Sequence, residues 1–297
     1  MALQTVRERA TATGCTMTAA QAYAARIDAV NAQQARVHGQ HAPHDPWGAA
    51  AAIFRFDPHR TLDANLEAIA FLVQPEETLI DVGGGAGRLS LPLALRCRET
   101  INIEPSPGMK AVFESLAAEA GITRASVVQA PWLEAEGIEG DVVVCADVTY
   151  FVRDIVPFIA KLQAAARHRV ILTVWSVPPP NRRAPLYRLL YGEAQEWAPG
   201  YRELLAVLWD MDILPDVRVL PNPPWWDTEV PETSEQAVEL ALQSRWLAPQ
   251  DEERMRHLVE THFQTLFVSD NGGLRPLWRA DARELLITWQ THQKRMA

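Results

Sequence analysis

The sequence predicts an α/β protein built on a doubly wound, mostly parallel sheet. Short apolar stretches typical of buried strands alternate with helical segments between residues 78 and 175. The alternation occurs repeatedly, and a chain that returns through a helix between two strands places those strands in parallel. The predicted strands cover residues 78–82, 100–104, 126–129, 141–146 and 169–175.

Helices are predicted on either side of these strands. Residues 18–37 place apolar side chains at helical spacing, which favours an N-terminal covering helix. A second apolar stripe at residues 62–73 follows Thr61, a residue type that caps helices. The helix after the second strand is framed by Ser106 as its cap and by Gly121 as its terminator.

The composition changes after residue 177. The stretch that follows is rich in Pro, Trp and Tyr, which predicts an insertion or lid with a helix at 201–211 and a short strand at 217–220. An apolar strand at 283–289 is expected to close the sheet. The expected parts are an N-terminal helical cover (1–60), the core (61–177), the lid with its helices (178–270) and the closing strand (271–297).

Charge and cysteine usage limit the partners and the compartment. The 297 residues include 28 Lys and Arg against 37 Asp and Glu, a formal net charge of −9. Because clustered basic side chains are what bind nucleic acid and anionic membranes, neither partner is expected. Cys15, Cys97 and Cys145 lie far apart without a CxxC pair, which indicates a reducing compartment and no structural zinc. The cytoplasm is the expected location, since no leader-like apolar run is present.

A glycine-rich loop follows the first predicted strand. Gly83, Gly85 and Gly87 have the spacing G-x-G-x-G directly before a predicted helix, where glycine lets the backbone approach a ligand closely. The dinucleotide pattern would need glycine at Arg88, and no Gly-Lys-Ser/Thr follows, so a nicotinamide site and a phosphate loop are disfavoured. A tight strand-to-helix turn without a ligand is the alternative.

The second predicted strand ends in Glu104. A carboxylate at this edge can accept both hydroxyls of a ribose, and Glu104 follows the loop at about the spacing of the acidic residue in a nucleoside-binding βαβ unit. A helix-capping role is the alternative. The loop and the acid together predict a ligand that contains a nucleoside.

These features resemble the class I S-adenosylmethionine-dependent methyltransferases. The matching stretches are LIDVGGGAGRLSL (79–91), INIEPSPGM (101–109), QAPW (129–132) and DVVVCADVTYF (141–151). The resemblance covers residues 60–175. It implies a Rossmann-like fold and S-adenosyl-L-methionine as the cofactor.

The resemblance also implies a role for each matching position. The residues expected beside the methionine part of the cofactor are Asp81, Gly83, Gly85 and Gly87. Glu104 is expected to bind the ribose hydroxyls. The residues expected to border the adenine are Pro105, Ser106 and Trp132, and those expected beneath the sulfonium are Ala146 and Asp147.

Several absences narrow the class. The family often has Asp or Asn after the third strand to bind the adenine amine, but this chain has Ala130, so stacking on Trp132 and backbone groups are expected instead. No Asn/Asp-Pro-Pro-Tyr follows the fourth strand, which disfavours methylation of exocyclic amines in nucleic acid. No acidic pair follows the fifth strand, and His38, His41 and His44 lie at a helix end and in a proline-broken loop, so no metal is expected.

Asp147 is the first candidate for a general base. Methyl transfer is an in-line displacement for which a dry, oriented pocket suffices for much of the rate, but a hydroxyl or amine acceptor also needs a base. Ligands bind at the carboxyl ends of parallel strands, which favours Asp147 and Tyr150 as catalytic residues over His168 at the opposite end. A helix cap or a cofactor contact is the alternative for Asp147.

Aromatic residues gather in the insertion. The candidates for a substrate pocket are Trp175, Tyr187, Tyr191 and Trp225. They predict a small, apolar or aromatic methyl acceptor. The alternatives are packing of the lid onto the sheet and a homodimer interface.

The sequence therefore predicts an S-adenosylmethionine-dependent methyltransferase that acts on a small molecule by in-line transfer. A non-catalytic nucleoside-binding or scaffold protein with the same fold is the alternative, since fold does not fix function. A nicotinamide-dependent oxidoreductase is disfavoured by the loop spacing.

Overall fold

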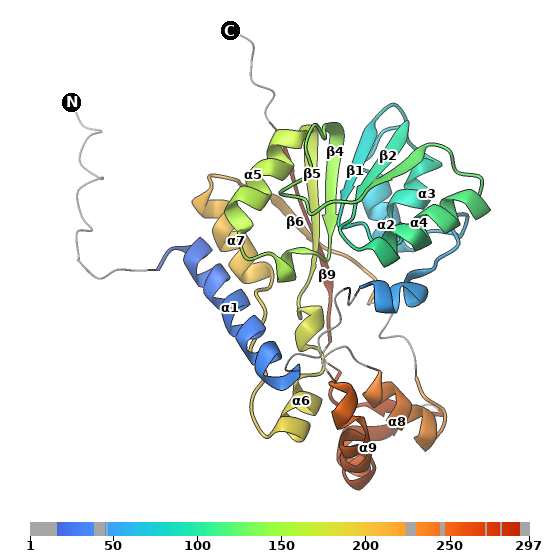
Figure 1. The fold of residues 1–297 in the computed structure, drawn as a ribbon, viewed down its shortest axis with the longest axis vertical. Coiled ribbons are helices and arrows are strands. Elements are labelled where there is room, and N and C mark those ends of the chain that lie inside the picture. The colour runs from blue at the N-terminus through green and yellow to red at the C-terminus, as the bar shows by residue number, and fades with distance from the viewer. Residues whose placement is uncertain are drawn as a thin grey trace, which may run out of the picture.

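A seven-stranded sheet forms the centre of the computed structural model, which describes residues 17–38, 45, 47–223, 230–243, 247–270, 272–279 and 281–291. The strand order is β3-β2-β1-β4-β5-β9-β6, and β9 runs antiparallel to both of its neighbours while the other strands share one direction. The strands are β1 (Thr78–Val82), β2 (Glu99–Ile103), β3 (Ala125–Val128), β4 (Gly140–Ala146), β5 (Ala166–Trp175), β6 (Asp216–Val219) and β9 (Glu284–Gln290). This arrangement confirms the doubly wound, mostly parallel α/β fold (Figure 1).

Helices cover both faces of the sheet. One face packs against α1 (Ala19–His38), α5 (Ile155–Ala165) and α7 (Tyr201–Asp210), and the other against α2 (Ala64–Ala70), α3 (Ser90–Ala94) and α4 (Pro107–Glu119). Strand β4 has apolar side chains on both faces of the sheet: Val143 and Cys145 belong to the first apolar cluster, and Val142 and Val144 belong to the second. A strand buried on both faces reads as a continuous apolar run, which is why the sequence reveals it.

Helix starts follow the expected chemistry with one correction. Ser106 Oγ accepts the Met109 N–H at 3.1 Å at the start of α4, as predicted. Thr61 does not cap α2, because the helix begins three residues later and the carboxylate of Asp63 accepts the N–H groups of its first turn. The cap is the residue directly before the first turn, and Asp63 holds that place.

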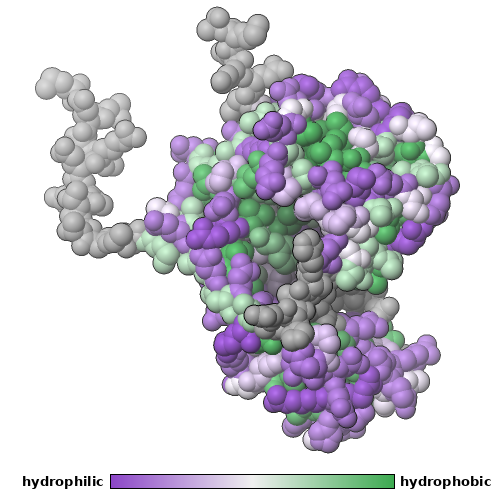
Figure 2. All heavy atoms as spheres, viewed as in Figure 1, coloured by the Kyte–Doolittle hydropathy of each residue, from purple (hydrophilic) through white to green (hydrophobic). Residues whose placement is uncertain are grey.

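Two insertions build a lid beyond the carboxyl end of the sheet. We use this name for α6 (Ala184–Tyr191), α8 (Ser234–Leu242), α9 (Glu252–Thr261), α10 (Phe263–Leu266) and the hairpin of β7 (Phe267–Asp270) and β8 (Gly273–Pro276). Their apolar side chains form a core of their own. In Figure 2 the outer surface of this lower lobe is predominantly hydrophilic, which agrees with an apolar interior.

The insertion is more divided than its composition suggested. Helix α7 and strand β6 lie within residues 178–270, yet α7 packs on the central sheet and β6 forms its edge. Helix α6 and the β7–β8 hairpin were not expected from the sequence. None of the described helices combines the length and apolar character that crossing a bilayer requires.

Candidate functional site

The glycine loop joins β1 to α3 in a left-handed backbone conformation. The φ angles of Gly83, Gly85 and Gly87 are 72°, 57° and 87°. An added Cβ at Gly83 or Gly87 would lie 2.5 or 2.6 Å from a neighbouring side chain, so packing alone requires glycine there. At Gly85 the nearest atom would be Met109 Sδ at 3.7 Å, which is ordinary contact. The loop therefore faces open space at Gly85, where a ligand can approach the backbone.

Two polar side chains of the second strand hold this loop in place. Asn102 Oδ1 accepts the Gly84 N–H at 3.1 Å, and Asn102 Nδ2 donates to the Gly85 carbonyl at 2.9 Å. Glu104 Oε2 accepts the Gly85 N–H at 2.9 Å, and its Oε1 accepts the Ser106 N–H at 2.8 Å. Glu104 thus lies where β2 ends, beside the loop, as the sequence predicted. The supporting role of Asn102 was missed, although a polar residue inside an apolar strand was the available signal.

Burial changes the acidity of the two carboxyl groups near the loop. Desolvation raises the pKa of Glu104, while the N–H groups of Ser106 and Gly85 act in the opposite direction. Desolvation also raises the pKa of Asp81 to about 6. Asp81 Oδ2 lies beneath the loop, where a Cβ on Gly84 would approach it to 2.3 Å. Asp81 therefore contacts the loop from the side of the sheet.

The adenine side is only partly as expected. Pro105 is exposed at the end of β2, and Ser106 is buried as the cap of α4. Trp132 instead lies in the main core, where its indole N–H donates to the Phe158 carbonyl at 3.4 Å and Lys161 Nζ sits 4.9 Å from the ring centroid. A large ring after a strand gains more by burial against α5 than by standing at the sheet edge. The structure thus corrects the expectation that Trp132 offers an open stacking face.

Asp147 follows β4 in a strained backbone conformation. Its φ of 63° lies in the left-handed region, which costs a non-glycine residue on the order of 1–3 kcal/mol and is often found at functional sites. Ala146 ends the strand directly before it. The next residue, Val148, packs on the glycine loop, because a Cβ on Gly83 would lie 2.5 Å from its Cγ2. Asp147 is thereby fixed beside the loop, at the carboxyl edge of the sheet.

The surroundings of Asp147 are both charged and dry. Only 18% of its side chain is exposed, and its Oδ2 lies 3.6 Å from an Arg88 guanidinium nitrogen. Burial raises the pKa of Asp147 to about 7, and the negative charge of Glu284 adds to this shift. Arg88, Arg182 and a hydrogen bond with the Trp175 side chain act in the opposite direction. A carboxyl group with a pKa near neutrality can gain and lose a proton under physiological conditions.

Tyr150, the second catalytic candidate, is fixed inside the core. It is 2% exposed, and its hydroxyl accepts the backbone N–H of Trp175. Burial raises the pKa of Tyr150 well above its usual value. The phenol therefore stays neutral, and the structure provides no route for it to act as a base.

The predicted aromatic pocket is largely absent from the described residues. Tyr187 and Tyr191 pack against each other with ring centroids 4.7 Å apart inside the core of the lid, and the Tyr191 hydroxyl donates to Asp251. Trp175 is 2% exposed at the end of β5, with Arg182 over its ring at 5.6 Å. The rings of Tyr187 and Tyr191 belong to the core of the lid, which corrects the assignment of both tyrosines to a substrate pocket. Trp225 lies outside the described residues.

Two buried polar residues at this edge were missed from the sequence. Glu284 pairs with Trp175 across β9 and β5 and is 4% exposed. Asn65 of α2 donates to Glu284 Oε2 at 2.8 Å and is 6% exposed. They join a helix of one face to the strand that closes the sheet. Their signal was a polar residue in an apolar stripe, which single-residue patterns do not distinguish from a surface position.

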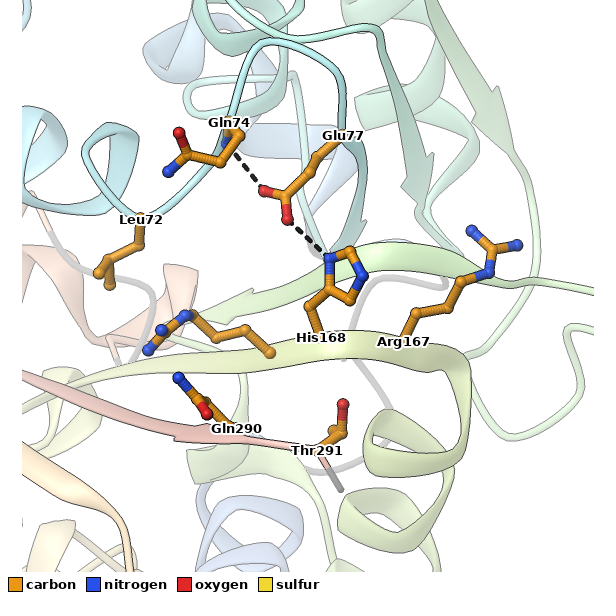
Figure 3. Close-up of a pocket in the computed structure, with 8 residues that line it drawn as sticks. Leu72, Gln74, Glu77, Arg167, His168, Gln290 and Thr291 are labelled. Carbon is orange, nitrogen blue, oxygen red and sulfur yellow. Dashed lines mark hydrogen bonds and ion pairs between the residues drawn. The ribbon is translucent and has the colours of Figure 1, made fainter. Parts of the chain in front are cut away.

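A hollow of about 520 Å³ lies at the opposite end of the sheet. It is lined by His168, whose Nδ1 lies 2.8 Å from Glu77 Oε1, and by Arg167, Gln290 and Thr291 (Figure 3). This end carries the amino end of β5, whereas ligands of parallel sheets bind at the carboxyl ends. Among the described residues, no group of three or more His, Cys, Asp or Glu side chains is arranged to hold a metal.

The fold, the loop and the acid after β2 together form a site that suits a ligand containing a nucleoside. Residues 80–173 match the family model of a methyltransferase domain. The match covers 94 of the 297 residues, so residues 80–173 are similar to a methyltransferase domain, and S-adenosylmethionine is the cofactor that this resemblance implies. No curated protein matches the sequence.

Two solved structures share this fold at low sequence identity, and a third with a lower TM-score is also similar. The YcgJ protein from Bacillus subtilis is 15% identical with a TM-score of 0.51, and the match covers 77% of this chain and 98% of that one. A candidate methyltransferase from Bacillus halodurans C-125 is 12% identical with a TM-score of 0.53, over the same shares. Magnesium protoporphyrin IX methyltransferase from Synechocystis PCC 6803 with bound SAH is 17% identical with a TM-score of 0.44, over 69% of this chain and 94% of that one.

The residues around the glycine loop fit S-adenosylmethionine as a cofactor. The loop leaves open space only at Gly85 among its glycines, so a ligand can contact the backbone at that point. The carboxylate of Glu104 stands next to it and can accept ribose hydroxyls through its remaining lone pairs. Gly85 and Glu104 are the residues that would hold the cofactor. Asp147, directly after β4, lies beside the same glycine loop.

Proposed function

We propose that the protein is an S-adenosylmethionine-dependent methyltransferase that modifies a small molecule bound between the carboxyl edge of the sheet and the lid, with Asp147 as the general base. The observation that carries this proposal is the position of Asp147. It directly follows β4 beside the glycine loop in a strained conformation, and burial raises its pKa to about 7, which suits proton transfer at neutral pH.

The cofactor, when bound, supplies an electrophilic methyl group on a sulfonium. The protein's own contribution is to orient the acceptor and to receive its proton. Asp147 Oδ2 can accept that proton from a hydroxyl or an amine, and Arg88 at 3.6 Å stabilises the ionised carboxylate before transfer. Because the side chain is mostly buried, little water competes for it.

The acceptor that suits this site has one ionisable O–H or N–H group on a largely apolar body. Val148 and Val177 follow β4 and β5 and are both partly exposed, which supports an apolar rim around the carboxylate. Trp175 belongs to the apolar cluster against which both valines pack. The aromatic or apolar acceptor predicted from the sequence is thus retained as a proposal on the strength of these residues rather than of the lid tyrosines.

The test combines binding with transfer. S-adenosylmethionine carrying a labelled methyl group is incubated with the protein and a panel of small phenols, amines and carboxylic acids, and the label is followed into products. We expect transfer to at least one phenol or amine, a loss of about 100-fold in Asp147→Asn, and no loss in the exposed control Asp154→Asn. Equal turnover in both variants would contradict the role of Asp147, and label found only in added RNA or protein would contradict the acceptor class.

A further inference from the structure

A short segment before the core crosses the carboxyl edge of the sheet. We call it the strap and define it as Asp45 together with residues 47–54, which include the 3-10 helix η2 (Gly48–Phe54). In Figure 1 this helix is the unlabelled blue one at the lower edge of the core, apart from the labelled α1.

The strap is fastened to the start of α4 through Asp45. The Oδ2 atom of Asp45 accepts the Ser106 hydroxyl at 2.9 Å and the Gly108 N–H at 3.2 Å, while Oδ1 accepts the Gly48 N–H at 2.8 Å. The hydrogen bond from Gly48 is the main cause that lowers the pKa of Asp45. The negative charge of Asp45 in turn contributes to the raised pKa of Glu104. Asp45, the first residue of the strap, therefore lies close to Glu104, the residue expected to bind the ribose.

A direct contact between two backbones fixes the strap more tightly. An added Cβ at Gly108 would lie 2.4 Å from Gly48 Cα, and one at Gly48 would lie 3.2 Å from Gly108 Cα. Neither position can carry a side chain while the strap lies where it does. Glycine within a helix is otherwise unfavourable by about 1 kcal/mol relative to alanine. Gly108 is thus costly for α4 itself and is required by the strap.

Further along, the strap contacts the glycine loop and the turn after β4. Ala51 forms one buried cluster with Ala86 of the loop and Met109 of α4. Trp47 meets Phe151 edge to face, with ring centroids 5.4 Å apart at an interplanar angle of 80°. Phe151 belongs to η3 (Thr149–Phe151), which follows Asp147. Both rings remain partly exposed, at 37% and 50%.

The loop, the start of α4 and the turn after β4 are the three elements that surround the cofactor site, and the strap touches all of them. We propose that the strap closes over the adenosine side of the cofactor and controls its exchange, with Asp45 and Trp47 as positioning residues. Asp45 acts through Ser106 and Glu104, and Trp47 acts through Phe151. The proposal rests on the cofactor binding assigned above.

The position after β3 gives a reason for such a cover. Ala130 offers no side-chain hydrogen bond to the adenine amine, and Trp132 is buried against α5. Ala130 and Trp132 therefore offer an adenine ring no polar side chain and no exposed aromatic face, and a closed strap would slow the release of the cofactor in their place. Cofactor entry and product release then require the contact between Gly48 and Gly108 to open.

Gly108→Ala tests the proposal without weakening α4, because alanine is the better helix former. The matched control is Glu114→Ala, an exposed position of the same helix. Dissociation rates of S-adenosylhomocysteine are measured by stopped flow, and melting temperatures are measured alongside. We expect Gly108→Ala to release the ligand about tenfold faster while it keeps a cooperative melting transition, and Glu114→Ala to behave as wild type. Equal release rates in all three proteins would overturn the proposal.

Hydrogen exchange supplies a second readout that a merely structural strap would not move. In the wild type, S-adenosylhomocysteine should slow amide exchange in residues 47–54, and the slowing should be smaller in Trp47→Ala and Asp45→Ala. No change on ligand addition in the wild type would also overturn the proposal. If the wild type does not bind S-adenosylhomocysteine at all, the cofactor assignment fails, and that result is distinct from unchanged exchange at saturating ligand.

Discussion

The Asp147 carboxylate and the Arg88 guanidinium lie 3.6 Å apart where the glycine loop meets the end of β4. Arg88 occupies the place at which a dinucleotide-binding loop would have its third glycine. The departure from that pattern thus brings a cation to a carboxylate that burial makes less acidic. A base of this kind is strong enough to receive a proton and is still ionised in part near pH 7.

The pH dependence of methyl transfer follows from this pair. A base works in its ionised form, so kcat/KM is expected to rise with pH through an apparent pKa near 7, the value to which burial raises Asp147. Rates measured between pH 5.5 and 8.5, a range of about 1.5 pH units on either side of neutrality, cover the transition. Asp147→Asn should lose this rise of kcat/KM with pH, together with most of the rate of methyl transfer. A wild-type profile that stays flat across the range would argue against Asp147 as the base.

Gly85→Val should abolish cofactor binding and leave the fold intact. The space in front of Gly85 is open, so the side chain would occupy the ligand's place, and the left-handed backbone adds about 1–2 kcal/mol of strain. Gly121→Ala is the matched control, because Gly121 has a φ of 65° and nothing within 4 Å of an added Cβ. Titration calorimetry with S-adenosylmethionine and circular dichroism separate the two effects. Binding that survives in Gly85→Val would refute the placement of the cofactor against this loop.

Glu104→Gln should weaken cofactor binding by about 1.5–3 kcal/mol, the usual scale for a hydrogen bond to a charged group. Glutamine keeps the shape of the side chain, so the N–H groups of Gly85 and Ser106 retain one acceptor. A 2′-deoxyribose analogue of the cofactor should bind the wild type more weakly but lose little further affinity in the variant. Equal discrimination by both proteins would show that Glu104 does not contact the ribose.

Asp81 should make the protein less stable as the pH rises from about 4 to about 6. Its pKa is raised from 3.8 to about 6 by burial, so the folded state binds this proton more tightly than the unfolded state does. The free energy of unfolding therefore decreases as pH passes from the unfolded to the folded value. Urea titrations across this range should give a flatter dependence in Asp81→Asn, whereas the exposed Asp154→Asn keeps the wild-type slope. Unchanged slopes in Asp81→Asn would show that the carboxyl is not protonated in the fold.

The core could be predicted from the sequence because its chemistry is local. Strand β1 is buried on both faces, and the glycine spacing and the acid after β2 follow from close backbone approach to a ligand. The small differences at strand ends reflect hydrogen bonding that a pattern of apolar residues does not fix.

The lid and the polar contacts could not be predicted in the same way. The sequence predicted no helix at α6, and Tyr187 and Tyr191 fit a core and a pocket equally well until α9 is placed beside them. The bond between Asn65 and Glu284 joins residues distant in the chain. Such contacts depend on tertiary packing, which a single sequence does not display.

The place of β9 between β5 and β6 sets an order for folding. Among the described strands, β6 lies at the edge of the sheet and pairs with β9 alone, which follows it in the chain after the whole of the α8–β8 insertion. Until residues 284–290 have been made and have entered the sheet, β5 exposes one backbone edge and β6 has no partner strand. Unpaired edges invite association with other chains, and a pairing between distant segments forms slowly. The second insertion must therefore tolerate being synthesised next to an incomplete sheet, and a shortened chain that ends before β9 would expose an aggregation-prone edge.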